Sequence, residues 1–415
     1  MHPELFLSWA LILLATLTTL GTEVVVDDRD GTLGQTRAPV VASVKLSKAE
    51  WHAVEEGRLG LAEVGQAKMV LPVQRFATNP ANARLHLVWL MPPGPHGQRK
   101  FALKKTRPSP QPTVVARFEA ASGQYDLTDA GRPVLRYNYA TIEPGDFVTN
   151  VAPASRIYAQ ARSDYIHPLF GLDGETLTKD WSVDHPHHRG IYWAWPEVDW
   201  RGQRGDLHAL QKVFARPTGE CKMTSGPVFA QLEAENVWKW ENGETLVRER
   251  AVVRAYHTAG DDRMVDLEFQ FTALNDPVLL ARRGTLHYGG LNLRFAKVAD
   301  QEIIWHTDPT NATPRMAWAE LSGKFPGAPT PGGVVVLQHR TNPDYPGDWV
   351  KFPELNWMQP TFPASGTRYE LQPGKPLILR FRLWLHRGAK AGADHCAVQW
   401  RTYQSPLTPA FLSTP

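Results

Sequence analysis

Short apolar segments separated by turn-forming residues recur along most of the chain, and few stretches show the spacing of a helix. Residues 264–271 alternate strictly, so the apolar side chains from Val265 to Phe271 share one face of a strand and the polar ones from Asp266 to Gln270 share the other. Further strands are predicted at residues 114–119, 124–127, 134–142, 191–195, 228–240, 246–256, 286–295, 333–339 and 377–386. Strands of this number and length predict an all-β fold built around a large antiparallel β-sandwich.

Changes in composition divide the chain into six segments. Residues 5–20 form an apolar run shorter than the ~20 residues that a helix needs to cross a bilayer. This predicts a secretory signal peptide over residues 1–21 and a periplasmic or secreted protein, with an uncleaved anchor as the alternative. A loose segment at 22–37 and a small β-rich domain at 38–107 follow, and three prolines at alternate positions make 108–112 a stiff linker. The large sandwich takes residues 113–390, and residues 391–415 form a C-terminal extension.

Composition and charge exclude some classes of protein. The 45 Lys and Arg against 42 Asp and Glu leave a net charge of +3, which offers no binding face for nucleic acid or for an acidic membrane surface. With 42% hydrophobic and 21% charged residues, the chain has the composition of a folded protein. Cys221 and Cys396 either form one disulfide or remain two buried thiols, and neither has the setting of a nucleophile or a zinc ligand.

The densest chemistry lies in residues 184–190, which include three of the 15 histidines. A proline between them favours an extended loop, in which His185 and His187 point the same way and His188 points to the other side. His187 or His188 can transfer a proton near neutral pH, with Asp184 or His185 orienting the ring. Alternatively, His185 and His187 share a divalent metal, for which the sequence identifies no third ligand. A third interpretation is structural, with the loop hydrogen-bonded to Asp180 or Asp184.

An arginine and a group of tryptophans accompany the histidines. Arg189 is a candidate to hold an oxyanion or a carboxylate. The chain has 15 tryptophans, and Trp193, Trp195 and Trp200 follow the loop at short spacing, where they would stack on the apolar face of a sugar ring. Candidate carboxylates for acid/base chemistry are Asp180, Asp184, Glu197 and Asp199 near the loop, and Glu268 on the polar face of the alternating strand, which would then line a cleft.

Two resemblances add to these expectations. Arg162, Tyr165, His167 and Asp180, followed by residues 184–190, are similar to the signature of a secreted bacterial family labelled PmoA-like, or methane oxygenase PmoA. The similarity runs from about residue 112 to the C-terminus. It implies a protein of carbohydrate-degrading bacteria whose activity is not established, and it adds these four residues as candidates for substrate binding. Residues 286–293 resemble the histidine strand of galactose mutarotase-like sandwiches, in which His287 would act on the substrate.

The leading hypothesis is an enzyme that acts on a sugar or sugar derivative by hydrolysis, elimination or epimerisation. His187 or His188 would transfer the proton and Arg189 would hold negative charge. A non-catalytic carbohydrate-binding protein is the first alternative, and a metal-dependent oxidoreductase, as the family label suggests, is the second. The expected partner is a small-molecule or oligosaccharide ligand, with no nucleic acid and no membrane contact beyond the signal peptide. A divalent metal on His185 and His187, under the second alternative, is the one cofactor considered.

Overall fold

The computed structural model describes residues 17–18, 21–28, 31, 33–44, 47, 50, 52–53, 56–65, 69–79, 84–106, 112–258, 260–306 and 315–404. The chain forms two compact units. The first consists of the described residues up to Thr113, with Gly226–Val228 and the chain from Val398 onward. The second consists of Val114–Ser225 and Phe229–Ala397. Strands dominate both units and helices are few, which confirms the predicted all-β sandwich architecture.

The first unit contains two antiparallel sheets around its own hydrophobic core. The strands of the larger sheet are, in order, β1 (Leu17–Thr18), β2 (Gly21–Asp28), β8 (Gly97–Lys105), β4 (Leu59–Glu63) and β5 (Val70–Pro72). Those of the smaller sheet are β3 (Ala38–Val44), β7 (Arg84–Met91) and β6 (Gln74–Asn79).

The segment predicted to be loose, residues 22–37, instead contributes most of a strand. Its first part is β2, which pairs with β8 and buries Val24 and Val26 at alternate positions. The prediction was wrong there because two buried valines and a paired partner strand outweigh the acidic residues around them. The predicted signal peptide at 1–21 and the predicted linker at 108–112 fall almost entirely outside the described residues.

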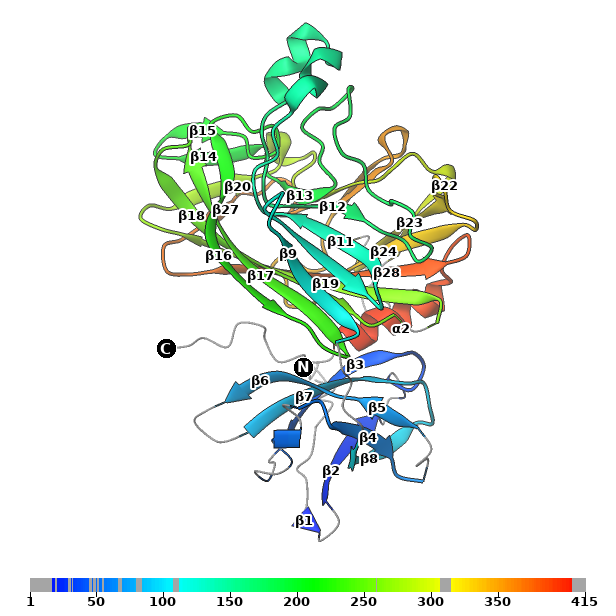
Figure 1. The fold of residues 1–415 in the computed structure, drawn as a ribbon. Coiled ribbons are helices and arrows are strands. Elements are labelled where there is room, and N and C mark those ends of the chain that lie inside the picture. The colour runs from blue at the N-terminus through cyan, green and yellow to red at the C-terminus, as the bar shows by residue number, and fades with distance from the viewer. Residues whose placement is uncertain are drawn as a thin grey trace, which may run out of the picture. The chain divides into compact units, whose positions relative to one another are not determined.

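The second unit is a sandwich of two eight-stranded sheets with a smaller four-stranded sheet (Figure 1). One large sheet has the order β25 (Trp349–Phe352), β26 (Trp357–Pro360), β21 (Gly290–Arg294), β13 (Ile191–Ala194), β12 (Tyr165–Leu169), β11 (Arg132–Asn138), β10 (Gln124–Asp129) and β9 (Val114–Glu119). The other has the order β16 (Val213–Thr224), β17 (Phe229–Trp240), β18 (Thr245–Tyr256), β19 (Asp262–Ala273), β28 (Leu377–Arg387), β24 (Gly332–Gln338), β23 (Trp318–Lys324) and β22 (Ala299–His306). The small sheet has the order β15 (Gln203–Gly205), β14 (Glu197–Trp200), β20 (Val278–Ala281) and β27 (Tyr369–Leu371).

The helices are short. In the part of the chain that the structure describes, four are 3-10 helices, η1 (Gly145–Asn150), η2 (Pro153–Tyr158), η3 (Arg283–Thr285) and η4 (Pro353–Leu355), and α2 (Ala393–Tyr403) lies in the C-terminal extension. Among the described residues, no helix is long and apolar enough to cross a membrane. Residues 286–288, predicted to open a strand, form a turn after η3, because the N–H groups of Leu286 and His287 donate back to the carbonyl of Arg283. The strand β21 therefore begins only at Gly290.

The tryptophans that follow the histidine loop belong to the hydrophobic core of the second unit. The Trp193 ring lies 4.7 Å from that of Trp195 and nearly parallel to it, and it contacts Phe269 and Phe271 of the opposite sheet at centroid distances of 5.0 Å. Trp195 is 0% exposed and Trp200 is 5% exposed. The prediction that Trp193, Trp195 and Trp200 stack on a ligand is therefore wrong. Alternate residues of a strand share a face, and on β13 that face is turned into the sandwich.

The alternating strand β19 behaves as predicted on its apolar face. All four apolar side chains from Val265 to Phe271 are buried in the core. On the polar face, Asp266 pairs with Arg382 at 2.6 Å and Glu268 pairs with Arg380 at 2.7 Å, each opposite its partner on β28. Cross-strand ion pairs thus engage these two carboxylates, and neither lines the pocket described below, although the sequence suggested that this face would line a cleft.

The first strand of its sheet, β16, is an edge strand with an irregular course. Its pairing with β17 is interrupted by a bulge between Pro217 and Cys221, and Lys222 to Thr224 beyond it are exposed.

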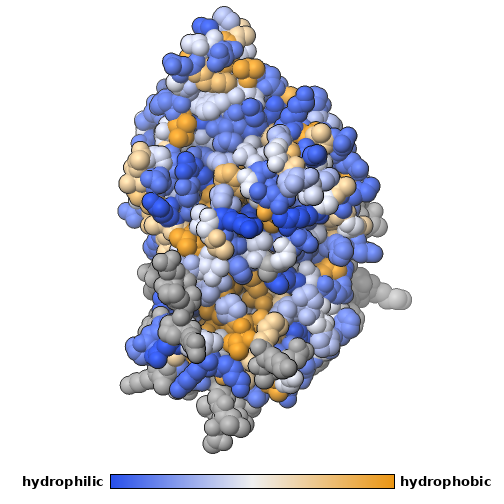
Figure 2. Space-filling view, turned by 45° about the vertical axis from the view of Figure 1, so that its right-hand side comes forward, coloured by the Kyte–Doolittle hydropathy of each residue, from blue (hydrophilic) through white to orange (hydrophobic). Residues whose placement is uncertain are grey.

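Polar residues cover most of the face drawn in Figure 2, with hydrophobic residues showing in separate areas. Cys221 and Cys396 are both free thiols, so they form no disulfide; Cys396 is buried, as that alternative required, whereas Cys221 is only half-buried.

Replacing Trp193 tests its place in the core. We expect Trp193→Ala to lower the free energy of unfolding by about 3–5 kcal/mol, because the substitution leaves a cavity between the two large sheets. Urea unfolding followed by circular dichroism measures this loss. The exposed Met223 supplies the control, since Met223→Ala should change the midpoint little. A Trp193→Ala protein of unchanged stability would contradict the assignment of this ring to the core.

Candidate active site

A glycine fixes the point at which the histidine loop, residues 184–190, joins the sheet. Gly190 has a φ of +66°, and a Cβ atom at this position would collide with the carbonyl oxygen of Ile166 on β12. Only glycine combines this backbone conformation with so close an approach. The N–H of Gly190 donates to the carbonyl of Lys179 at 2.8 Å, and its own carbonyl accepts from the N–H of Arg294 at 2.9 Å. The loop therefore enters β13 in one defined position.

A turn inside the loop brings its histidines together. The N–H of His188 donates to the carbonyl of His185 at 3.0 Å, which reverses the chain between them. The ring centroid of His188 lies 4.7 Å from that of His185 and 4.6 Å from that of His187. The predicted extended loop, with His188 pointing away from the other two, is therefore wrong. The proline at position 186 occupies the turn rather than holding the loop straight.

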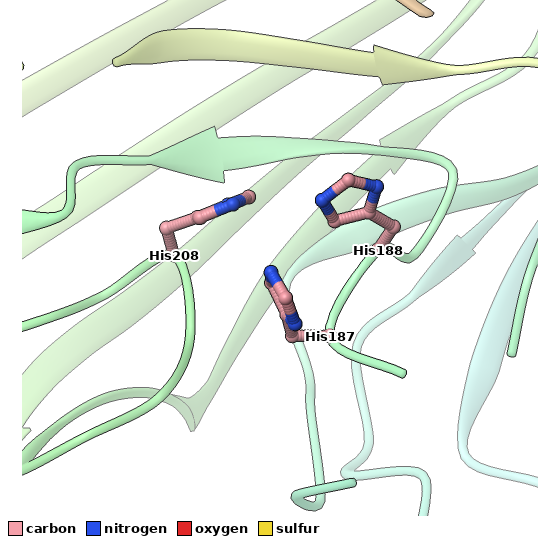
Figure 3. A group of neighbouring side chains, drawn as sticks. All are labelled: His187, His188 and His208. Carbon is pink, nitrogen blue, oxygen red and sulfur yellow. The ribbon is translucent and has the colours of Figure 1, made fainter. Parts of the chain in front are cut away.

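A third imidazole reaches these rings from a distant part of the sequence. His208 lies between β15 and β16, and its ring centroid is 4.6 Å from that of His187 and 5.2 Å from that of His188. One ring nitrogen from each of the three lies within 4.8 Å of the other two. Figure 3 shows the three side chains gathered around one space. The sequence suggested His185 and His187 as a pair that could share a metal, whereas the structure brings together nitrogens of His187, His188 and His208.

Buried polar contacts hold His208 in place. The hydroxyl of Tyr192 lies 3.0 Å from its Nδ1, which leaves Nε2 of that ring available to a ligand. The guanidinium of Arg162 donates to the backbone carbonyls of Leu207 at 3.1 Å and of His208 at 2.6 Å, and it stacks over Tyr192 at 4.2 Å. Such outer contacts orient a ligating imidazole and fix its tautomer. Arg162, predicted to bind substrate, is therefore a positioning residue that is 3% exposed.

The three imidazoles are held in the neutral form. Burial, with the nearby charge of Arg162, lowers the pKa of His187 to about 3. Burial also places the pKa of His188 and of His208 well below the usual value, and each neighbouring ring adds to the effect. A neutral imidazole is the form that coordinates a metal, whereas a group with so low a pKa is a poor proton donor near neutral pH. The electrostatics favour ligation over proton transfer at His187 and His188.

The three imidazoles line a pocket of about 850 Å³ within the second unit. This size is within the range of small-molecule sites. Its aromatic lining consists of Tyr158, Tyr288, Phe352 and Trp357. Its other polar lining includes His185, Arg204, Asp206, Gln211, Lys212, Arg283 and Glu354. Aromatic surfaces and polar groups therefore surround the space beside the three ring nitrogens.

Two pairs of titratable groups stand at the pocket beside the three imidazoles. Burial raises the pKa of Asp206, whose carboxylate accepts from the N–H of Ala209 at 2.7 Å and from Arg283 at 2.6 Å. Nδ1 of His185 lies 3.0 Å from a carboxylate oxygen of Asp184, and the ring is half-buried. Partial burial alone would raise the pKa of Asp184, but the contacts with His185 and Arg294 lower it overall. Asp184 therefore orients His185, whereas the sequence suggested that Asp184 or His185 would orient the ring of His187 or His188.

Arg189 has a structural role and does not line the pocket. It is 1% exposed, and its guanidinium pairs with Asp180, hydrogen-bonds the hydroxyl of Tyr165 and stacks on Trp181 at 3.4 Å. Its predicted role in holding an oxyanion in the pocket is therefore wrong, because the side chain is buried outside the pocket lining and pairs with Asp180, although its Nη1 has no hydrogen-bond partner among the described residues. Tyr165 and Asp180, predicted to bind substrate, support Arg189 instead.

Other predicted site residues also lie away from the pocket lining. Nδ1 of His167 lies 3.0 Å from the hydroxyl of Thr178, within the sheet that carries the loop. His287 is exposed and is not part of the pocket lining. Glu197 and Asp199 both pair with Arg204, at 3.0 Å and 2.6 Å. Of the predicted residues, His185, His187 and His188 meet at the pocket, with Asp184 behind His185.

Several residues of the pocket lining were not predicted from the sequence. His208 and Asp206 are isolated polar residues about twenty positions after the loop, and nothing local connects them with it. Tyr288 comes from the turn that takes the place of the start of the predicted strand, and Arg283 comes from η3 just before it. Trp357 lies on β26, much later in the sequence. The one available signal was the alternation of Asp206 and His208 beside a turn. It is too common a pattern to indicate a ligand.

Comparison with known proteins places the chain among its relatives. The model of a family of unknown function, DUF6807, matches residues 124–401, which is about two thirds of the 415 residues. The chain belongs to this family. The matched region contains every residue of the pocket lining, so the candidate active site of this DUF6807 protein lies entirely within the family domain. No curated protein matches the chain.

The low pKa of His187 predicts how the metal-free DUF6807 protein responds to acid. As the pH falls below about 6.5, this imidazole gains a proton in the unfolded chain but stays neutral in the folded protein until about pH 3. The unfolded state then binds more protons, so the free energy of unfolding falls with decreasing pH. The slope is at most about 1.4 kcal/mol per pH unit for one such group. Urea unfolding of chelator-treated protein between pH 7 and 4.5 should show a shallower slope for His187→Gln than for the wild type. Equal slopes would contradict the assignment.

Proposed function

We propose that this protein is a metal-dependent enzyme that acts on a sugar or sugar derivative in the pocket, with His187, His188 and His208 binding a divalent cation. The observation that carries the proposal is the convergence of three imidazole nitrogens within 4.8 Å of one another at the wall of a pocket. Three histidines with a fourth position open to a ligand are a common arrangement in catalytic zinc sites. Nitrogen ligands alone suit Zn²⁺ and other late transition metals better than Mg²⁺ or Ca²⁺.

The cation would supply the reactive centre, and the chain would supply its surroundings. A cation on three imidazoles acts as a Lewis acid and lowers the pKa of a coordinated water. Tyr192 and Arg162 hold His208 in the orientation that ligation needs. His185, oriented by Asp184, is the pocket residue suited to proton transfer, because its imidazole is half-buried and not among the three clustered nitrogens. This assignment moves the proton-transfer role from His187 or His188 to their neighbour.

The lining of the pocket supports a carbohydrate ligand. Tyr158, Tyr288 and Phe352 are half-buried, so each presents part of its ring to the pocket, which sugar CH groups can contact. Asp206, Gln211 and Glu354 offer oxygens or amides to sugar hydroxyl groups. These rings take the place of the buried tryptophans in the earlier hypothesis. The resemblance to the PmoA-like family and the predicted signal peptide agree with a secreted or periplasmic enzyme of carbohydrate metabolism.

Metal content is the first test. We expect the purified chain without a His tag to bind about one zinc at the pocket. His208→Ala should lose this equivalent, because it removes one of three ligands and leaves the other two without the full set. Elemental mass spectrometry after dialysis measures the stoichiometry. His287→Ala is the matched control, since His287 is exposed and outside the pocket, and it should keep the metal. If His208→Ala retains as much metal as the wild type, or if neither protein binds zinc, copper or iron, the metal site is refuted.

Turnover is the second test. We would incubate the metal-loaded protein with p-nitrophenyl glycosides and with disaccharides of glucose, galactose and xylose, and follow products by chromatography with mass detection. Turnover should disappear on metal removal and return on adding metal. Phe352→Ala should raise KM by about 2- to 10-fold with little change in kcat, because it removes aromatic contact and no ligand. Turnover that survives both chelation and His208→Ala would refute metal dependence. Sugar binding without any product would favour the non-catalytic alternative.

A further inference from the structure

A second cluster of metal-ligating side chains lies away from the pocket lining. His306 is at the end of β22, Glu320 is on β23 and Cys396 is in the first half of α2. One ligand atom from each of the three, a ring nitrogen, a carboxylate oxygen and the thiol sulfur, lies within 4.8 Å of the others. None of the three lines the pocket. The proposed function uses none of them.

The sheet register explains how two of these residues meet. On the antiparallel pair β22 and β23, His306 lies opposite Trp318, and Ile304 lies opposite Glu320. Opposed residues and alternate residues of paired strands share one face of the sheet. His306 and Glu320 therefore project from the same face as near neighbours. Cys396 reaches them from α2, where its side chain is 0% exposed.

Glu320 is a fully buried carboxylate with only one oxygen engaged. Its Oε1 accepts from the N–H of Ala391 at 2.9 Å and lies 3.1 Å from Nε2 of His386. Its Oε2 has no hydrogen-bond partner among the described residues, and the same holds for Nε2 of His306. A buried carboxylate oxygen and a buried imidazole nitrogen without partners are costly unless something binds them. Both residues belong to the cluster, and a cation bound between them would satisfy both atoms.

His386 contacts the carboxylate of Glu320 and is not itself one of the three clustered residues. Its Nδ1 faces the carbonyl of Arg387 at 3.0 Å, and a carbonyl can only accept, so Nδ1 carries a proton. Its Nε2 lies 3.1 Å from Oε1 of Glu320, and it donates to an ionised carboxylate there when it carries a proton as well, that is, in the imidazolium form. Gly333 leaves room for the imidazole, because a Cβ atom at that position would lie 2.5 Å from Nε2. Contacts of this kind, which fix a ligating carboxylate through its second oxygen, are typical of built metal sites.

We propose that His306, Glu320 and Cys396 bind a Zn²⁺ ion. Thiolate, imidazole and carboxylate are all zinc ligands, whereas a sulfur and a nitrogen in the set exclude Ca²⁺ and Mg²⁺ as the preferred ions. The ion would connect α2 with the sheet edge formed by β22 and β23, with its fourth position left to a water molecule. We assign it a structural role because its ligands lie outside the pocket lining. The sequence indicated neither cysteine as a zinc ligand, because the other two ligands lie 76 and 90 positions before Cys396 and share no local motif with it.

Cobalt substitution in the full chain tests this site separately from the pocket. A thiolate bound to Co²⁺ gives an intense charge-transfer band in the near ultraviolet, whereas a site of three imidazoles does not. We expect the wild type loaded with Co²⁺ to show this band and Cys396→Ala to lose it together with about one equivalent of metal. Glu320→Gln, which keeps the shape of the side chain, should weaken cobalt binding at this site at least tenfold. Cys221→Ala is the matched control and should keep both the band and the stoichiometry.

The two metal sites can fail independently. If the pocket binds no metal, the wild type still binds one equivalent, and Cys396→Ala removes it. If the pocket alone binds metal, His208→Ala removes it and no thiolate band is seen at any cobalt concentration. The second result overturns the cysteine site. So does a Cys396→Ala protein with an unchanged band, provided that its circular dichroism spectrum matches that of the wild type.

Discussion

The close approach of Gly190 to β12 is the constraint on which the site depends. The backbone there lies so near the carbonyl of Ile166 that a side chain has no space, and hydrogen bonds to Lys179 and Arg294 fix its position. The turn that gathers the histidines therefore starts from a rigid point. The aromatic core behind β13 secures that point in turn, because Trp193 is packed against Phe269 and Phe271 of the opposite sheet. The geometry of the pocket thus rests on sheet packing more than on the loop itself.

The two clusters illustrate two ways of placing ligands in a low-dielectric interior. At the pocket, all three proposed ligands are imidazoles that burial keeps neutral, so a bound cation would retain its full charge and its power to polarise a substrate. At the second cluster, a thiolate and a carboxylate would neutralise the ion. A charged centre open to a pocket suits catalysis, and a neutralised centre inside the protein suits a permanent cross-link. The proposed catalytic site therefore has neutral ligands and the proposed structural site has charged ligands, as the two roles require.

The sequence predicts features that depend on residues close together in the chain, and it fails for contacts between residues that are far apart in the chain. Alternating apolar residues specify a strand locally, so the face of β19 that carries Val265 and Phe271 could be predicted. The histidine loop could be found because its residues are adjacent in the chain. His208 could not be found, because its approach to His187 depends on how β14 and β15 turn the chain back. Arg189 was assigned to the substrate because its partner Asp180, nine positions earlier, gave no sign that it would occupy the guanidinium.

The tryptophans were misassigned for a related reason. Dense aromatic spacing of i, i+2 places rings on one face of a strand, but the sequence does not say whether that face is turned to solvent or to a second sheet. Here it is turned to the second sheet, and the rings that remain for a ligand are the scattered Tyr158, Tyr288 and Phe352. These three rings belong to segments that lie far apart in the sequence. A binding surface assembled in this way leaves no continuous signature in the chain.

The irregular course of β16 has a consequence for how copies of this protein meet. A flat edge strand presents unpaired N–H and C=O groups on which the strand of another molecule can add. The bulge at Pro217 to Cys221 twists the edge, the proline removes one donor from it, and the exposed Lys222 places a charge beside it. One end of the eight-stranded sheet is thereby closed to growth. The edge of a second molecule therefore finds no flat, regular strand at this end of the sheet to which it could add.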